Sequence, residues 1–274
     1  MFAPLVGLIL LNAEVLTAPV DATVYSPATL EDTVWVGGWP NRSVAVDYLT
    51  GIRSGRIPGD LVGPDRMWVV GRDDCPLITQ VGHHINDPSI VRAPGHPERL
   101  YLYDTRLANV DAEGQRWSEH RIGFRSSIDG GCTWRDHGLI APGWSPSALV
   151  QGDRVWIYVH DAQATVWRLQ VINGWRVVAR ERVPDLQGLV NVDISVDGGG
   201  YRLVANAGLH QIVTSRSADG MTWSPPVVVL EAPEGWWLPT PHLDQAGRLL
   251  FAYGQAEGIG EISVHRWTIE WGDS

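Results

Sequence analysis

The stretch Asn86-Asp87-Pro88-Ser89-Ile90-Val91, followed by Arg99-Leu100-Tyr101-Leu102-Tyr103, sets a pattern that the rest of the chain repeats. A polar residue and a proline open a short apolar strand, a turn follows, and a second strand carries aromatic residues. Successive openings are separated by 61, 58, 46 and 49 residues, and an interval of roughly 45–50 residues is typical of a four-stranded propeller blade. The pattern therefore predicts an all-β fold, a five-bladed β-propeller of four-stranded antiparallel blades. The five opening residues are Ser26, Asp87, Ser145, Asn191 and Thr240.

Length and composition agree with this fold. The chain has 274 residues, including 30 Gly, 18 Pro and 14 Trp. Glycine and proline at this frequency interrupt helical patterns and provide tight turns between short strands. The sequence shows no linker and no second domain, so we expect one propeller domain over residues 1–274.

The charge pattern narrows the class of partner. The net charge is −10, and the sequence contains no basic cluster. Binding to nucleic acid or to an anionic membrane surface is therefore not expected. No run of 18 apolar residues occurs, so the sequence predicts no membrane span. We expect a monomer with a carbohydrate ligand.

The apolar residues 4–11 allow two interpretations. They resemble the core of a signal peptide, although no positive segment precedes them and no small-residue cleavage site follows. The repeat favours another role, because the last copy supplies three strands, ending with residues 261–269. Residues 4–11 would then be the fourth strand that closes the ring and covers a sheet edge. The localisation stays open, with secretion or a periplasmic location among the alternatives.

Cys75 and Cys132 are the two cysteines of the chain. Their spacing fits neither a zinc site nor a disulfide-rich scaffold. Two alternatives remain at this point, a disulfide between neighbouring blades and two buried free thiols.

The segment Ser127–Trp134 matches the pattern S-x-D-x-G-x-T-W at every fixed position. This pattern resembles the Asp box of the sialidase-like propellers, and residues 217–223 resemble its form shorter by one residue. The carboxylate accepts backbone N–H groups across the turn, Gly takes a positive φ, and Trp packs between sheets. Asp129 and Asp219 are therefore predicted to be structural. Sialidase activity is not expected, because no alignment places three Arg at the centre of the ring.

The copy at residues 86–103 resembles the five-bladed propeller glycosidases, namely glycoside hydrolase family 43 and the related fructosidase, family 117 and family 130 groups. The resemblance implies that each innermost strand begins at a central funnel, with its first polar residue facing the substrate. Asp87 resembles the aspartate that tunes the acid and orients the sugar in family 43. The chain departs from that family at Ser26 and Ser145, where the family has a base Asp and an acid Glu. A histidine near the start of the fifth blade holds a calcium ion or its water in family 43, and His242 resembles it.

Glycoside hydrolysis commonly needs two carboxyl groups about 5–9.5 Å apart. Asp87 and Asp193 are the acids of the innermost strands, and Glu234 lies in the loop before the fifth blade. The leading hypothesis is a glycosidase-like enzyme that needs no cofactor beyond the implied Ca²⁺; the alternative is a propeller that binds glycan or protein without catalysis. The candidate catalytic residues are Asp87, Asp193 and Glu234; the candidate binding residues are His83, His84, Ser89, Trp144, Ser145, Asn191, Trp236, Trp237 and His242; the candidate metal ligand is His242.

Overall fold

The computed structural model describes residues 14–15, 22–30, 33–40, 48–50, 55–57, 68–70, 83–108, 120–208, 210–233, 236–238, 240–244, 247–255 and 263–267. Antiparallel strands dominate these residues. The helical structure among them is the single 3₁₀ turn η2 (Pro184–Leu186). No helix within the described part is long and apolar enough to cross a membrane.

Three antiparallel sheets have four strands each, arranged in the order of the sequence. Turns of two or three residues join many of these strands, and in the three-residue turn 173–175 Asn173 and Gly174 have positive φ of 55° and 80°, as type I′ turns require. The second sheet of the chain consists of β7 (His83–Ala93), β8 (His96–Ala108), β9 (Arg121–Ser127) and β10 (Arg135–Pro142). The third consists of β11 (Trp144–Gln151), β12 (Arg154–His160), β13 (Val166–Ile172) and β14 (Arg176–Arg182). The fourth consists of β15 (Val190–Asp197), β16 (Gly200–Asn206), β17 (Gln211–Ser217) and β18 (Val227–Glu231).

The remaining strands come from the two ends of the chain. A last sheet contains β20, β21, β22 and β1, with β19 also paired to β21. A first sheet has the order β2-β3-β6, and β4 pairs with β5. The strands are β1 (Glu14–Val15), β2 (Ala22–Leu30), β3 (Thr33–Pro40), β4 (Tyr48–Thr50), β5 (Gly55–Ile57), β6 (Trp68–Val70), β19 (Trp236–Trp237), β20 (His242–Leu243), β21 (Leu249–Gln255) and β22 (Ser263–Trp267).

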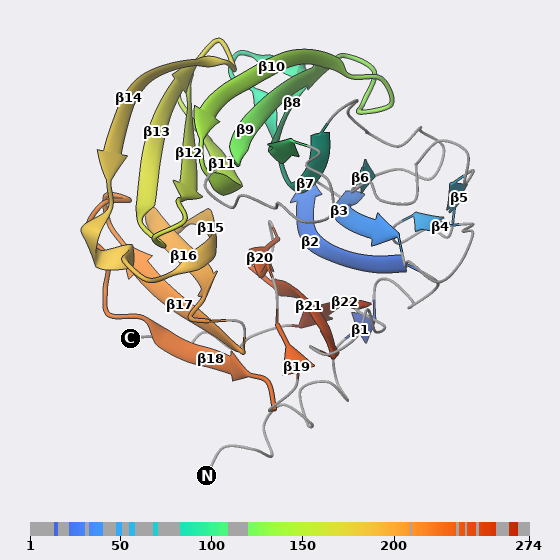
Figure 1. Ribbon diagram of the computed structural model, residues 1–274. Helices are drawn as coiled ribbons and strands as arrows, with labels where there is room; N and C mark the ends of the chain where they lie inside the picture. Colours follow the sequence, from blue (N-terminus) through green and yellow to red (C-terminus); the bar gives the residue numbers. More distant parts are fainter. Residues whose placement is uncertain are drawn as a thin grey trace.

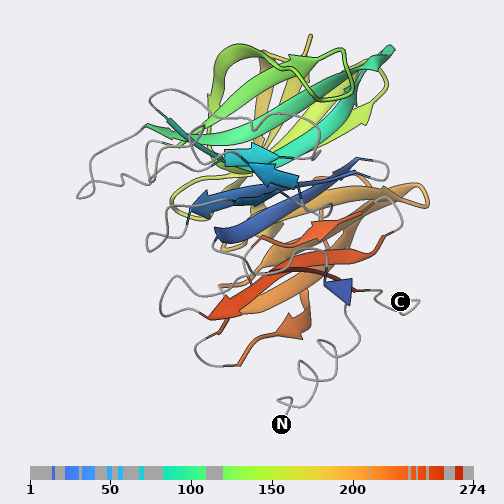
Figure 2. The same ribbon diagram turned by 90° about the vertical axis from the view of Figure 1, so that its right-hand side faces the viewer.

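The sheets are arranged around a centre (Figure 1). The strands β2, β7, β11, β15 and β20 each contact the next in this order, and β20 contacts β2. The outer strands β10, β14 and β18 lie at the periphery, and β2 and β3 lie between the second sheet and the last two in the side view (Figure 2). This is the arrangement of a β-propeller.

An N-terminal strand pairs with the C-terminal one. Glu14 and Val15 of β1 lie opposite Arg266 and His265 of β22. Residues 4–11, which the sequence predicted for this position, lie outside the described residues.

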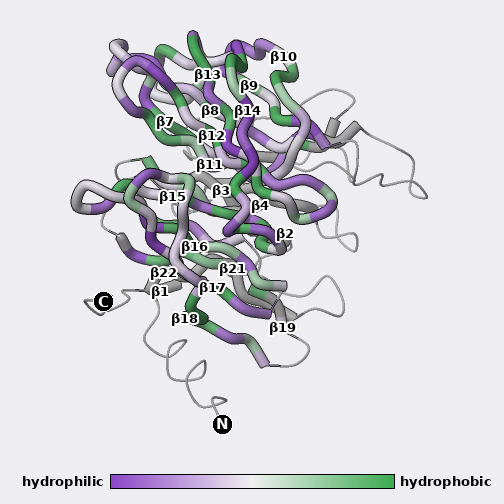
Figure 3. Tube along the Cα trace, turned by 90° about the vertical axis from the view of Figure 1, so that its left-hand side faces the viewer, coloured by the Kyte–Doolittle hydropathy of each residue, from purple (hydrophilic) through white to green (hydrophobic). Residues whose placement is uncertain are grey.

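Apolar side chains fill the spaces between neighbouring sheets, and hydrophobic residues are concentrated in the strands (Figure 3). Tyr103 and Phe124 belong to a cluster shared by the second and third sheets, and Tyr158 and Trp223 to one shared by the third and fourth. Ala28 and Leu102 pack between the first and second sheets. Period-two alternation along each strand places these residues on the faces that meet.

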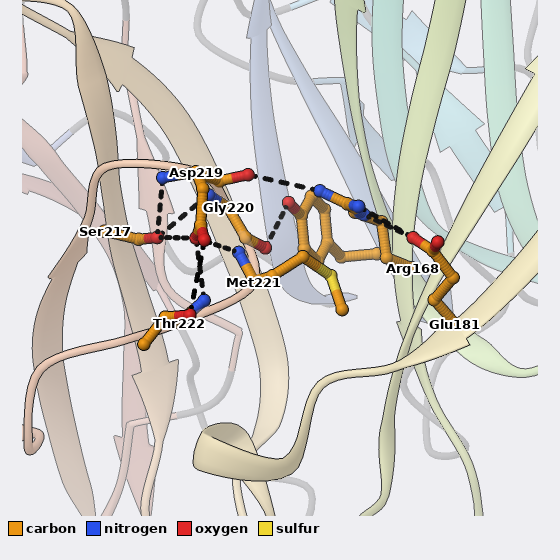
Figure 4. Close-up of polar contacts among 8 residues, drawn as sticks. Arg168, Glu181, Ser217, Asp219, Gly220, Met221 and Thr222 are labelled. Atoms are coloured by element: carbon orange, nitrogen blue, oxygen red, sulfur yellow. Dashed lines mark hydrogen bonds and ion pairs between the residues drawn. The ribbon is translucent and has the colours of Figure 1, made fainter.

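The two predicted Asp turns are held by local hydrogen bonds. Asp129 accepts the backbone N–H and hydroxyl of Thr133 at 2.9 and 2.5 Å. Asp219 accepts the N–H groups of Met221 and Thr222, each at 2.8 Å (Figure 4). These donors, first among them the Thr133 hydroxyl, hold the pKa of Asp129 well below its usual range.

The second Asp turn also docks on the neighbouring sheet. Tyr158 donates its hydroxyl to the Gly220 carbonyl at 2.8 Å, and Arg168 donates to the Asp219 carbonyl at 3.2 Å while pairing with Glu181 at 2.7 Å (Figure 4). The turn therefore links two sheets as well as two strands.

Cys132, in the first Asp turn, is disulfide-bonded, and no described cysteine is free. Of the two alternatives that the sequence left open, the disulfide is therefore the one that holds for this residue. Cys75, the other cysteine of the chain, lies outside the described residues.

Candidate functional site

The openings of the innermost strands meet at the centre of the molecule. Asp87, Ser145, Asn191 and Thr240 line a cavity of about 20 Å³ together with the prolines that follow three of them. Each of the four has a left-handed backbone, with φ of 47°, 45°, 50° and 46°. This conformation is uncommon for non-glycine residues, especially for a β-branched threonine. Strained backbone of this kind persists where the surroundings fix it, and it is frequent at functional sites.

A bulge accompanies four of the five openings. The strand register shifts between Tyr25 and Pro27, between Asn86 and Ser89, between Trp144 and Ser147, and between Val190 and Asp193. A bulge redirects a side chain relative to the regular alternation of the strand. The opening residue and the residue two positions later therefore take different environments.

Asp87 is the carboxylate of this group. Its Oδ1 accepts the Asn86 amide at 3.0 Å, and its Oδ2 lies 3.2 Å from the Ser145 hydroxyl. The same hydroxyl donates to Asn191 Oδ1 at 2.7 Å. Ser145 thus connects the openings of the second, third and fourth sheets.

The network continues toward the last sheet. Asn191 donates to Asn206 Oδ1 at 3.0 Å, and the same oxygen accepts the Thr240 N–H at 3.2 Å. Asn206 is fully buried and donates to the Leu238 carbonyl at 2.6 Å. Polar side chains therefore form a continuous arc across four sheets.

The residues two positions after the openings hold neighbouring strands together. At four junctions, the side chain at this position accepts the backbone N–H of the next innermost strand, one residue further along the repeat. The four bonds are Ala148 N–H to Ser89 Oγ at 2.9 Å, Ile194 N–H to Ser147 Oγ at 2.9 Å, Leu243 N–H to Asp193 Oδ2 at 2.8 Å, and Thr29 N–H to His242 Nε2 at 2.9 Å.

Asp193 is occupied on both oxygens. Its Oδ1 accepts the Ser147 hydroxyl at 2.8 Å, and its Oδ2 lies 2.9 Å from His242 Nδ1 in addition to the Leu243 N–H. Burial favours a raised pKa, but the interaction with His242 and the other hydrogen-bond donors lower the pKa of Asp193 below its ordinary value. Asp193 is therefore an ionised carboxylate within the inter-strand bonds.

His242 does not fit the calcium role that the family resemblance implied. Since Nε2 accepts the Thr29 N–H, Nδ1 carries the proton that faces Asp193. Neither nitrogen then presents a lone pair to a cation. Within the described ranges, no group of three His, Cys, Asp or Glu residues has the arrangement of a metal site.

Trp144, predicted to stack on a sugar, lies between two imidazoles. The ring of His120 is 4.4 Å from it at 83°, and that of His160 is 5.1 Å away at 65°. Both histidines are buried, while Trp144 is half-buried. This aromatic group adjoins Ser145 at the strand-opening end.

The structure says less about the other predicted site residues. Trp236 is half-buried and packs against the core between the fourth and last sheets. His83 and His84 belong to β7, and Trp237 to β19, but their side chains are not described. Glu234 lies outside the described residues.

A larger cavity of about 740 Å³ lies toward the other ends of the innermost strands. Its walls include Val91, Val150 and Val196, and the turns that follow them. Asp193 and His242 line both this cavity and the small one. Their paired side chains therefore separate the two.

A buried ionic cluster was missed by the sequence analysis. Asp104 pairs with Arg106 at 2.5 Å and with Arg125 at 3.0 Å, and Arg106 also pairs with Asp136 at 2.9 Å. Burial favours a lowered pKa for Arg106, but its two carboxylate partners raise it. The signal was present in the sequence, since Asp104 and Arg106 follow directly on the apolar residues 100–103 of β8.

No protein-family model matches the sequence, and no curated protein is similar to it. Solved structures with a similar fold include the Bacillus subtilis arabinanase Arb43A (TM-score 0.61, 11% identity, covering 92% of this chain and 97% of that one). The β-xylosidase RS223 has a TM-score of 0.60 at 11% identity and 95% coverage of both chains. Zg3597, a family 117 glycoside hydrolase of Zobellia galactanivorans, has a TM-score of 0.59 at 13% identity, covering 93% and 88%. The chain therefore has the fold of the propeller glycosidases.

Proposed function

We propose that residues 1–274 form a single five-bladed β-propeller, closed by an N-terminal strand, that binds a glycan at the strand-opening end of its centre. The ring of contacts from β2 to β20 and the pairing of β1 with β22 support five blades and closure. The hydrogen bonds of Asp129 and Asp219 support their assignment as Asp boxes of the sialidase type.

One observation carries the choice of site. Four strand-opening residues with left-handed backbones converge around one cavity, and Asp87 supplies the carboxylate among them. Asp87, Ser145 and Asn191 offer acceptor and donor atoms for sugar hydroxyls. Trp144 and the two tryptophans of β19 are assigned as apolar surfaces for the sugar ring.

The first candidate activity is hydrolysis of a glycosidic bond. It needs one carboxyl as acid and another as base or nucleophile. Asp87 is assigned to this pair. Asp193 is paired with His242 and holds the Leu243 N–H between two strands, so Glu234 is the second carboxyl that we favour. His83 and His84 are assigned to the edge of this pocket.

The second candidate function is glycan binding without turnover. It is favoured by Ser26 and Ser145, which stand where related glycosidases are expected to carry two further carboxylates. Under this alternative, Asp87 orients the sugar and no bond is broken.

Aryl glycosides and oligosaccharides of arabinose, xylose and galactose test both functions, because proteins of similar structure are described as acting on these sugars. Asp87→Asn keeps the side-chain shape and removes the charge, so hydrolysis should disappear at unchanged melting temperature. Asp153→Asn is the matched control, since Asp153 is exposed in the turn between β11 and β12. Wild-type binding without turnover would leave the binding function, and neither binding nor turnover would refute the proposal.

A further inference from the structure

Two buried side chains on second strands reach the openings of the sheets that follow them. Thr105 of β8 lies opposite Asn86, and Asn206 of β16 lies opposite Val190. In each pair the partner is the residue directly before an opening, so Thr105 and Asn206 hold the same position of the repeat. Both residues are buried, at 5% and 0% exposure.

Each of the two side chains accepts a backbone N–H from the opening of the next sheet. The Ser145 N–H donates to Thr105 Oγ1 at 2.9 Å, and the Thr240 N–H donates to Asn206 Oδ1 at 3.2 Å. Ser145 and Thr240 have left-handed backbones, with φ of 45° and 46°. The two acceptors therefore hold residues whose backbone conformation is intrinsically unfavourable.

The bulge explains why these N–H groups need a side-chain acceptor. In the third sheet the register shifts between Trp144 and Ser147, and a bulged residue loses its regular partner on the neighbouring strand. Thr240 precedes the paired residues of β20. A backbone N–H left without an acceptor inside a protein is unfavourable, so the neighbouring sheet supplies the acceptor.

The positions of these openings decide which groups a ligand meets. Ser145, held by Thr105, has its hydroxyl 3.2 Å from Asp87 Oδ2 and 2.7 Å from Asn191 Oδ1. Asn206 also accepts the Asn191 amide at 3.0 Å. A shift of either opening would therefore change the spacing of the hydroxyl, amide and carboxylate groups around the small cavity.

We propose that Thr105 and Asn206 are positioning residues, which hold the openings at Ser145 and Thr240 in their cavity-lining conformation by accepting their backbone N–H groups; this inference rests on the proposed function. Neither Thr105 nor Asn206 lines the small cavity itself. The ligand class is a neutral glycan, whose hydroxyl groups have to match the spacing of the opening residues. Affinity should therefore depend on acceptor atoms that no sugar touches.

The test compares two variants of one residue. Thr105→Val keeps the branched shape and removes the acceptor, while Thr105→Ser keeps the acceptor and removes a methyl group. We expect Thr105→Val to weaken binding of the best oligosaccharide of the panel by about tenfold, which corresponds to about 1.4 kcal/mol and lies within the range for an unpaired buried group. Thr105→Ser should bind almost as tightly as wild type. Asn206→Leu removes the acceptor at the other junction and should weaken binding as well.

A matched control and a local readout separate positioning from a general loss of stability. Ser215→Ala removes a buried hydroxyl that donates to the Ser224 carbonyl at 2.6 Å in the fourth sheet. It should lower the melting temperature without changing the affinity, measured by calorimetry at a temperature where every variant is folded. In Thr105→Val, amide hydrogen exchange should become faster at Ser145, while the Ile194 N–H at the next junction should keep its wild-type protection.

The outcomes separate the inference from the function on which it rests. If wild type binds but Thr105→Val or a folded Asn206→Leu binds equally well, the inference fails and the proposed function stands. Equal losses in Thr105→Val and Thr105→Ser would show a packing effect, and a loss of affinity in Ser215→Ala would show an effect of stability; either result also overturns the inference. Should Asn206→Leu not fold, the two Thr105 variants decide. If wild type binds no glycan of the panel, the proposed function fails, and this inference with it.

Discussion

Ser147→Ala probes the bonds that join neighbouring innermost strands. The Ser147 side chain is buried at 2% exposure. Its hydroxyl accepts the Ile194 N–H at 2.9 Å and donates to Asp193 Oδ1 at 2.8 Å. Alanine removes both contacts and leaves the backbone conformation of the strand unaltered.

The loss of stability comes from the groups that lose their hydrogen-bond partner. The Ile194 N–H would be buried without an acceptor, and leaving such a group unpaired costs about 1–3 kcal/mol. Asp193 would lose one donor but keep the Leu243 N–H and His242, so its contribution is smaller. We therefore expect the free energy of unfolding to fall by about 1–3 kcal/mol, with a fall in melting temperature of about 2–4 °C per kcal/mol.

Urea denaturation followed by tryptophan fluorescence measures this change. Ser195→Ala is the matched control on the same pair of sheets, since Ser195 makes no side-chain hydrogen bond among the described residues and is half-exposed. A double mutant with Asp193→Asn should be non-additive, because the two side chains are in contact. If Ser147→Ala were as stable as Ser195→Ala, the inter-strand bonds would not contribute as argued.

Three further perturbations and one reduction experiment follow from the same structure. Gly123→Ala would place a Cβ 1.9 Å from Arg106 Nε. Displacing Arg106 would break its buried ion pair with Asp104, which should lower the free energy of unfolding by about 3–5 kcal/mol in chemical denaturation. The control Gly152→Ala, at a residue with φ of 62° and no atom within 4 Å of the added Cβ, should lower it by only about 1–2 kcal/mol. Turn hydrogen bonds, first that of the Thr222 N–H, lower the pKa of Asp219 from 3.8 to about 2. The stability that these bonds provide above pH 3.8 should therefore be lost as the pH falls through about 2. In acid titrations, Asp219→Asn should not show this loss of stability. Burial lowers the pKa of His160 from 6.5 to about 4, so stability should fall by roughly 3 kcal/mol as the pH falls through this window; a wild type and a His160→Phe variant with the same pH dependence would contradict this. Thiol titration of the unfolded protein should find no free cysteine before reduction and two after it, with a lower melting temperature for the reduced protein.

The repeat predicted the strand order well because it rests on local chemistry. A proline after a polar residue marks a strand opening, and Asn173-Gly174 marks a hairpin turn, where the structure has positive φ at both residues and a loop longer by Trp175. These signals depend on neighbours in the sequence. The presence of β-sheets of four antiparallel strands followed directly, although β2 and β7 begin at Ala22 and His83, before the predicted openings at Ser26 and Asp87.

The site was harder to predict because it depends on bulges and on contacts between sheets. Regular alternation puts Asp87 and Ser89, or Asn191 and Asp193, on one face of a strand, and the sequence analysis therefore gave both members of each pair to the funnel. The bulges between them have no clear sequence signature. The contact between His160 and Trp144 was missed for a related reason, since the two residues come from different strands.

Two tasks are divided between the opening position of the repeat and the position two residues later. The opening residue varies in chemistry from copy to copy, as a ligand site requires, while the position two residues later supplies an acceptor at four junctions. The first copy has Ala28 at this position, which has no side-chain acceptor. There the ionic cluster of Asp104 and Arg106 lies on the face of β8 that carries Leu102, which packs against Ala28. Where the repeated hydrogen bond is missing, a buried ion cluster thus lies on the face of β8 that is turned toward the same interface.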